Sequence, residues 1–223
     1  MALSLFTACA LVLSQWLIWI WAPVEQQMGL VQKIFYFHLP LAWWGFVGFF
    51  LVFVCSIGYL KQRRESLDHL AAAGAELGLL FASLVLLTGI LWAKASWNVW
   101  WTWDPRLSTT LILWFIYSGY LIVRGTAMSS SRQKTVAAVL GIVAFLDVPL
   151  VFLSARLFRS IHPAVFASRE GSLPFEMLLT LAVSLVAWGG LFCLLLWLRF
   201  DQYRLEQSLK TAVWSLKRDG GET

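Results

Sequence analysis

Long apolar stretches alternate with short polar segments along this chain. Each apolar stretch has about 17 to 25 residues, the length that an α-helix needs to cross the ~30 Å hydrocarbon core of a bilayer. The pattern shows neither the strict alternation of barrel strands nor an internal repeat. It therefore predicts an all-α integral membrane protein, a six-helix bundle with spans near residues 3–22, 39–60, 71–93, 107–123, 135–154 and 174–198.

Composition points to the same fold class. Hydrophobic residues make up 60% of the 223 positions, charged residues make up only 13%, and the mean hydropathy is +0.73. Water cannot solvate such a chain as a compact globule. We expect a single membrane domain over residues 1–223, with a tryptophan-rich loop at 94–106 and a tail at 199–223.

Lysine and arginine are distributed unevenly between the two sides of the predicted bundle. Eleven of the 17 fall on one side: Lys61, Arg63, Arg64, Arg124, Arg132, Lys134, Arg199, Arg204, Lys210, Lys217 and Arg218. Such a bias marks the cytoplasmic side in short loops, so both termini are expected in the cytoplasm. The net charge of +5 then reflects orientation and contact with the anionic lipid bilayer, and no nucleic-acid partner is expected.

The segment between the third and fourth predicted spans is unusually aromatic. It reads WNVWWTWDPRL over residues 97–107, so that four of the 14 tryptophans fall within seven positions. If the segment forms a helical turn, four residues share one face: Trp97, Trp100, Trp101 and Asp104. Trp103 then points elsewhere. The cluster predicts a flat aromatic surface at the membrane interface that suits a large planar partner.

Two of the three histidines fall on the same predicted side as this cluster. His38 closes the loop before the second span, and His162 lies in the loop before the sixth. Two neutral imidazoles beside an aromatic surface suit haem, because haem iron accepts one nitrogen ligand on each side of the ring plane. Basic residues that could contact the haem propionates are available on this side: Lys33, Arg106, Arg156, Arg159 and Arg169.

The same residue types also have less specific roles in membrane proteins. Tryptophans commonly serve as interfacial anchors, and a histidine at the end of a span often forms only a structural hydrogen bond. Asp147, inside the fifth predicted span, could pair structurally or act near a ligand pocket, since charges in hydrocarbon usually face a partner or water. The rival functions are a secondary transporter, in which Asp147 and Glu76 relay ions, and a purely structural membrane subunit.

Several stretches resemble the haem-handling proteins of cytochrome c maturation. Residues 89–94, GILWAK, and 97–108, WNVWWTWDPRLS, resemble the tryptophan-rich signature of the CcmC family. Residues 33–40, KIFYFHLP, resemble the region of its first histidine. One position departs from the family pattern, which has Trp-Gly-Thr where this chain has Trp-Asn-Val at 97–99. Asn98 adopts left-handed backbone with less penalty than most residues, so the turn is expected to survive.

The resemblance implies a function and a set of site residues. A CcmC-like protein holds haem b at the periplasmic face of the bacterial inner membrane and promotes its covalent attachment to the haem chaperone CcmE. It handles haem rather than acting as an enzyme, and its partners include the ABC-type subunits CcmA and CcmB and the small membrane protein CcmD. By analogy, His38 and His162 would be the axial iron ligands. The haem would be positioned by Trp97, Trp100, Trp101, Trp103, Asp104 and Arg106.

The nearest rival within this class is a haem-delivery component of another cytochrome c assembly route. Relatives of that kind have more spans and further histidines within the membrane region. No histidine is expected inside a span of this chain, which favours the CcmC-like function. The sequence contains no nucleotide-binding motif, so any ATP hydrolysis is expected of the partners.

Overall fold

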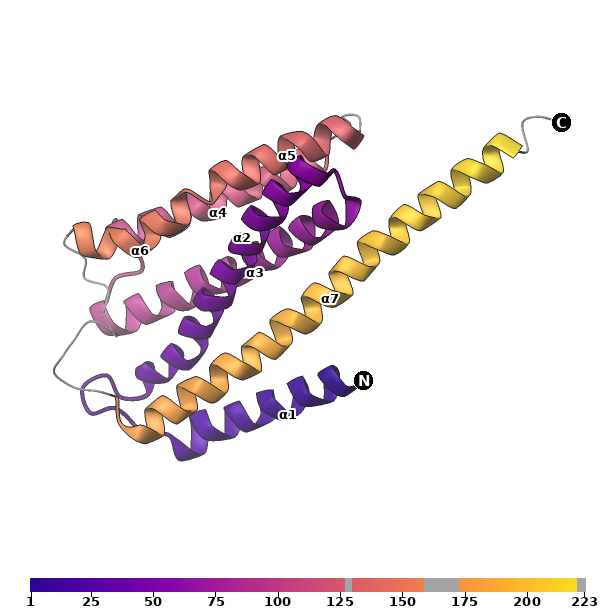
Figure 1. Ribbon diagram of the computed structural model, residues 1–223. Coiled ribbons are helices and arrows are strands. Elements are labelled where there is room, and N and C mark those ends of the chain that lie inside the picture. The colour runs from indigo at the N-terminus through magenta and orange to yellow at the C-terminus, as the bar shows by residue number, and fades with distance from the viewer. Residues whose placement is uncertain (127–129, 159–172, 220–223) are drawn as a thin grey trace.

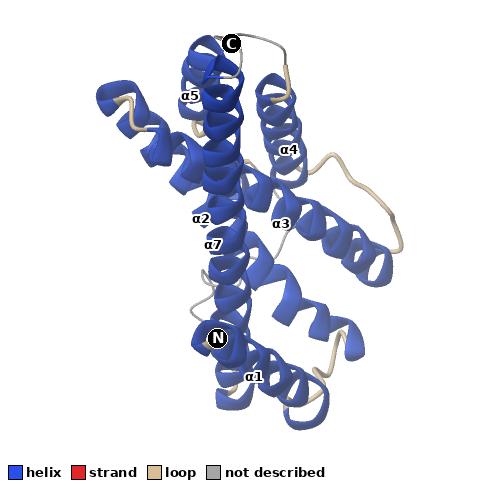
Figure 2. Ribbon diagram, turned by 90° about the vertical axis from the view of Figure 1, so that its right-hand side faces the viewer, coloured by secondary structure: helices blue, strands red, loops and turns tan. Residues whose placement is uncertain are grey.

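The computed structural model describes residues 1–126, 130–158 and 173–219 (Figure 1). Within these ranges the chain is mostly helical, and the only strand-like pairing is an isolated bridge between Glu25 and Gly29 (Figure 2). The α-helices are α1 (Ala2–Trp16), α2 (Phe35–Gln62), α3 (Glu65–Trp97), α4 (Pro105–Arg124), α5 (Ser130–Ala144), α6 (Asp147–Leu157) and α7 (Phe175–Asp219). A π-helical turn, η1 (Leu17–Trp21), continues α1, and a 3-10 helix, η2 (Leu30–Ile34), leads into α2.

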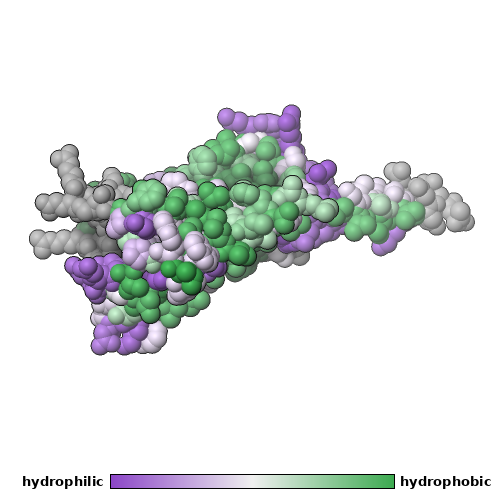
Figure 3. Space-filling model, turned by 90° about the horizontal axis from the view of Figure 1, so that it is seen from below, coloured by the Kyte–Doolittle hydropathy of each residue, from purple (hydrophilic) through white to green (hydrophobic). Residues whose placement is uncertain are grey.

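Six helical stretches are long and apolar enough to cross a membrane: Ala2–Trp21, Leu30–Gln62, Glu65–Trp97, Pro105–Arg124, Ser131–Ser154 and Phe175–Lys217. The prediction of an all-α, multi-pass membrane protein with six spans is therefore confirmed. Figure 3 shows hydrophobic residues over most of one face and hydrophilic residues gathered toward its ends. Lipid favours this arrangement, because helices satisfy their own backbone hydrogen bonds while apolar side chains face the hydrocarbon.

The bundle has two chemically different ends. Because the spans run alternately in opposite directions, one end of the bundle, at the left of Figure 1, holds the 22–29 loop, the 98–104 segment, the end of α6 and the start of α7. We call this the tryptophan-rich end. The opposite end holds the α2–α3 turn, the end of α4 and the second half of α7, and we call it the basic end. Here α7 projects beyond the other helices, so residues 199–219 of the expected tail are helical.

The fifth predicted span is divided into two helices. α5 ends at Ala144 and α6 begins at Asp147, with a turn between them. Pro149 explains the break, because in a continuous helix its ring would clash with the carbonyl group of Phe145, four residues earlier. Asp147 thus lies at a helix start and is only 7% exposed, and its Oδ2 has no hydrogen-bond partner within the described ranges. The length of α6 separates Asp147 from the tryptophan-rich end.

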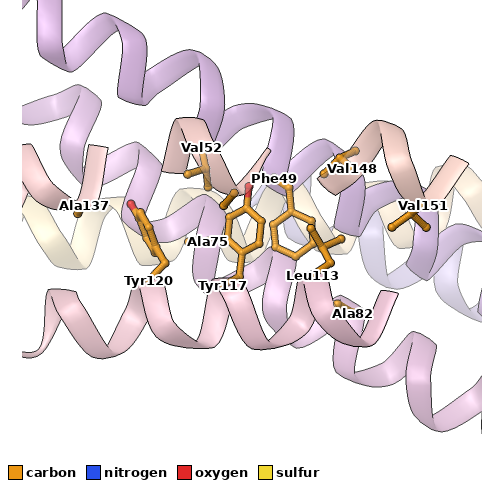
Figure 4. Packing of buried hydrophobic residues seen from close by; sticks show 11 residues of the cluster. Phe49, Val52, Ala75, Ala82, Leu113, Tyr117, Tyr120, Ala137, Val148 and Val151 are labelled. Atoms are coloured by element: carbon orange, nitrogen blue, oxygen red, sulfur yellow. The ribbon is translucent and has the colours of Figure 1, made fainter. Parts of the chain in front are cut away.

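Aromatic and small residues pack the middle of the bundle (Figure 4). The ring of Phe49 in α2 stacks on the ring of Tyr117 in α4, with 3.9 Å between their centroids. Helices α2 and α3 approach each other closely, because a Cβ atom on Gly48 would lie only 3.0 Å from the Cα of Gly78. This packing fixes α2 and α3 against each other, and the tryptophan-rich end holds the start of α2 and the end of α3.

Ion pairs join α3 to neighbouring helices at the basic end. Arg124 of α4 donates two hydrogen bonds, each 2.8 Å long, to the carboxylate of Asp68. Arg199 of α7 pairs with Glu76, whose carboxylate also accepts a hydrogen bond of 2.5 Å from the Tyr203 hydroxyl. Glu76 is one of the two residues that the transporter hypothesis uses as ion relays, and in the structure it is paired with Arg199 and Tyr203.

Candidate functional site

The tryptophan-rich segment is a non-helical connection between two helices. α3 ends at Trp97, residues 98–104 have no regular secondary structure, and α4 begins at Pro105. The helical turn that would place four residues on one face therefore does not form. The reason lies at the two ends of the segment, where Asn98 terminates α3 and Asp104 starts α4.

The indole rings at this end nevertheless form pairs. Trp101 and Trp103 lie edge to face with 5.9 Å between centroids, and Trp97 packs in the same manner on Trp92 at 5.0 Å. Trp103 is 79% exposed and Trp100 is 59% exposed. The Trp101 indole N–H is buried, with no hydrogen-bond partner among the described residues. The exposed rings of Trp100 and Trp103 offer apolar surface to a planar ligand or to lipid headgroups.

Asn98 forms the turn at which this chain departs from the family pattern. Its backbone is left-handed, with φ 59° and ψ 20°. The Lys94 ammonium donates to the Asn98 side-chain oxygen at 2.8 Å and lies 5.6 Å from the centroid of the Trp100 ring. Asn98 thus adopts the left-handed backbone that its residue type favours.

Replacing Asn98 by alanine is expected to lower the free energy of unfolding by about 1–2 kcal/mol, because alanine lacks the short polar side chain that lets asparagine adopt left-handed backbone with less penalty. Asn98→Gly removes the same side-chain hydrogen bond, but glycine adopts left-handed backbone readily, so the free energy of unfolding should fall less. Unfolding of the two detergent-purified variants measures the difference. Equal losses would assign the stabilising role to the Lys94 hydrogen bond instead.

Asp104 caps helix α4. It is 7% exposed, and its Oδ1 accepts a hydrogen bond of 2.9 Å from the backbone N–H of Arg106. Pro105 occupies the first helical position, where a missing N–H does no harm. The sequence pattern predicted only a binding role for Asp104, so this capping role is an addition.

Substitution of Asp104 can separate capping from binding. Asp104→Ala should lower the free energy of unfolding by about 0.5–2 kcal/mol. Asp104→Ser should retain most of the wild-type stability, because serine is also a good cap. Thermal unfolding measures stability, and absorbance after haem titration measures binding. If Asp104→Ser were as unstable as Asp104→Ala, capping would not be the stabilising role.

His38 lies in helix α2 and not in a loop. α2 begins at Phe35 and includes Pro40, and Nδ1 of His38 lies 2.9 Å from the Thr88 hydroxyl oxygen of α3. The expectation that His38 closes the preceding loop is wrong, because η2 runs directly into α2. His38 and His69 both lie within helices of spanning length, each in the first two turns of its α-helix.

The other predicted site residues are distributed over several elements. His162, Arg159 and Arg169 lie outside the described residues, as does the side chain of Arg156. Arg106 is half-buried in the first turn of α4, at the tryptophan-rich end. The structure thus places His38, the tryptophans and Arg106 at the same end of the bundle.

Lys33 is withdrawn from the surface. It is 4% exposed, and its ammonium donates to the carbonyl oxygen of Ile18 at 2.7 Å and to that of Trp19 at 3.4 Å. The end of a helix leaves carbonyl groups unpaired, and Pro23 has no N–H to offer to them. The prediction that Lys33 is available to a propionate is therefore wrong.

A pocket of about 380 Å³ opens between the first loop at this end and the end of α3. Its lining residues are Gln27, Met28, Val31, Trp92, Ala95, Ser96 and Trp97. The carboxylate of Glu25 shapes the loop by accepting hydrogen bonds from the backbone N–H groups of Gln27 and Met28. Trp92 was not predicted as a site residue. Its place in the GILWAK stretch at residues 89–94, which resembles the family signature, was the signal that could have found it.

Comparison with known proteins decides the family. The sequence profile described as Heme exporter protein C matches residues 1–215. The chain belongs to this family. The Heme exporter protein C of Bradyrhizobium diazoefficiens is 34% identical over 173 residues, which cover 77% of this chain and 66% of that protein. The protein of the same name from Haemophilus influenzae is 28% identical over 187 residues, covering 83% and 75% of the two chains. That from Escherichia coli K12 is 28% identical over 148 residues, covering 65% and 60%.

Proposed function

We propose that this protein binds haem at the periplasmic face of the bacterial inner membrane and promotes its transfer to the haem chaperone CcmE during cytochrome c maturation. One observation supports the proposal above all others. The match to the Heme exporter protein C family extends over residues 1–215, and so includes both candidate histidines and the whole tryptophan-rich segment. The relatives that define the comparison carry haem export in their names.

In this proposal His38 and His162 ligate the iron of haem b, one from each side of the ring plane. The indoles of Trp97, Trp100, Trp101 and Trp103 form the surface on which the haem lies. Asp104 fixes the start of α4, and Arg106 in the following turn binds a propionate. The described part of the site fits such a ligand, because an imidazole and several exposed indoles occur at the same end of the bundle.

The two ends of the bundle support the proposed orientation. The basic end faces the cytoplasm together with both termini, because basic residues are retained on that side and attract anionic lipids. The tryptophan-rich end then faces the periplasm, where CcmE receives haem. CcmA and CcmB supply ATP hydrolysis, and CcmD completes the assembly. The covalent step is promoted by proximity, since holding haem and chaperone together converts a bimolecular reaction into an effectively unimolecular one.

Purification with and without CcmE tests the proposal. The protein made alone in haem-replete cells should show a haem absorption band and a positive pyridine haemochrome assay. Made together with CcmE, it should yield chaperone that carries covalent haem. Protein that never contains haem, but that drives ion-coupled uptake in vesicles, would overturn the proposal in favour of a secondary transporter.

A further inference from the structure

We propose that Thr88 is a positioning residue, whose hydroxyl group holds the His38 ring in the Nδ1–H tautomer so that Nε2 is the nitrogen that binds iron. The inference deepens the proposed function and rests on it, because it states how His38 is prepared as a ligand. Thr88 acts through His38, on a neighbouring helix 50 residues further along the chain.

The hydroxyl proton of Thr88 is already used within α3. Its Oγ1 lies 2.7 Å from the carbonyl oxygen of Leu84 and 3.1 Å from that of Val85, so the hydroxyl donates to its own helix. The same Oγ1 lies 2.9 Å from Nδ1 of His38. Because a carbonyl oxygen can only accept, the contact with the ring requires that Nδ1–H donates and Oγ1 accepts. In a neutral imidazole the lone pair then lies on Nε2.

Packing holds the ring in the same orientation. A Cβ atom on Gly89 would lie 3.3 Å from Cε1 of His38, so the bare backbone at residue 89 gives the edge of the imidazole its place against α3. Thr88 therefore holds the ring by a hydrogen bond, and Gly89 leaves room for the edge of the ring because it has no side chain. The close approach of α2 and α3 at Gly48 and Gly78 keeps both contacts in register.

In this arrangement Thr88 contacts the nitrogen of His38 that does not bind the metal. A histidine that binds metal through one nitrogen is commonly oriented by a hydrogen bond from its other nitrogen, which also makes the ligand more basic. Loss of such a bond typically weakens metal affinity by roughly 10–100-fold. Ferric iron favours a basic ligand more than ferrous iron does. Loss of the Thr88 contact is therefore expected to weaken ferric haem binding more than ferrous haem binding.

The tautomer of His38 can be measured without haem. In haem-free protein labelled with ¹⁵N-histidine and held in lipid nanodiscs, nuclear magnetic resonance should show His38 protonated at Nδ1, with the signal assigned by its loss in His38→Gln. Thr88→Val should give a mixture of tautomers, and Thr88→Ser should restore the wild-type signal. Thr180→Val is the matched control, because Thr180 is fully buried and makes the same bond within its own helix, to the Glu176 carbonyl oxygen at 2.7 Å. An Nε2–H signal in the wild-type protein would overturn the inference.

The haem-bound protein gives a second readout. Thr88→Val should bind ferric haem at least about tenfold more weakly. Each tenfold by which the affinity for ferric haem falls more than the affinity for ferrous haem raises the midpoint potential by about 59 mV. Thr88→Ser should keep the wild-type potential. His38→Ala distinguishes a wrong ligand assignment from a wrong role for Thr88. If it leaves haem binding unchanged, the proposed ligand is wrong; if it weakens binding while Thr88→Val keeps the wild-type affinity and potential, only the inference about Thr88 fails.

Discussion

Protein in which His38 and His162 are both alanine is expected to lose the haem absorption band and to leave CcmE without covalent haem. Haem iron would then lack both proposed axial nitrogens, and the tryptophan surface alone offers no metal ligand. Each single variant should retain partial binding, because one imidazole remains. Pyridine haemochrome assay of the purified variants and haem staining of co-expressed CcmE measure the two losses.

His69 provides the matched control for this experiment. It lies at the basic end, is 7% exposed and stacks on the ring of Tyr203, with 5.9 Å between centroids. His69→Gln should therefore keep the haem spectrum and the loading of CcmE. Normal loading in the double variant would refute the ligand assignment. So would cysteine-accessibility mapping that placed positions 38 and 162 on opposite faces of the membrane.

The six spans were predictable because each depends on the total hydropathy of about 20 residues, and a single position hardly changes that total. Helix ends depend on single residues instead. Pro149 divides the fifth span because of one clash with the Phe145 carbonyl group, and a hydropathy pattern averages such a contact away. The turn at Asn98 could be predicted, since its cause is the local backbone preference of one residue.

The site was less predictable because its chemistry depends on partners from other elements. The sequence shows that Lys33 is charged, but only the fold shows that carbonyl oxygens of η1 accept hydrogen bonds from its ammonium group. The contact between His38 and Thr88 likewise depends on the register of α2 against α3. By contrast, a resemblance to a family transfers residue types together with their positions. It could therefore indicate the tryptophan-rich segment before any contact was known.

Substitution of Asp68 by asparagine is expected to produce the largest loss of stability, about 3–5 kcal/mol in the free energy of unfolding. The side chains of Asp68 and Arg124 are 4% and 14% exposed, and two hydrogen bonds of 2.8 Å join them. Removing the carboxylate leaves the Arg124 guanidinium buried without its counter-charge. The contacts that remain, to the amide oxygen of the introduced asparagine and to the Tyr120 hydroxyl at 3.3 Å, carry no counter-charge. Unfolding in mixed detergent micelles gives the difference from the wild-type protein.

Two further variants distinguish the buried pair from charge in general. Replacing both partners by apolar residues, Asp68→Leu with Arg124→Met, should recover most of the lost stability, because neither charge then remains unpaired. Asp201→Asn removes an exposed partner that lies 4.0 Å from Arg204, with side chains 48% and 63% exposed, and should change stability by at most about 1 kcal/mol. If Asp68→Asn cost no more than Asp201→Asn, the ion pair between α3 and α4 would not stabilise the basic end. If the double variant were less stable than Asp68→Asn, burial of the unpaired guanidinium would not be the cause of the loss.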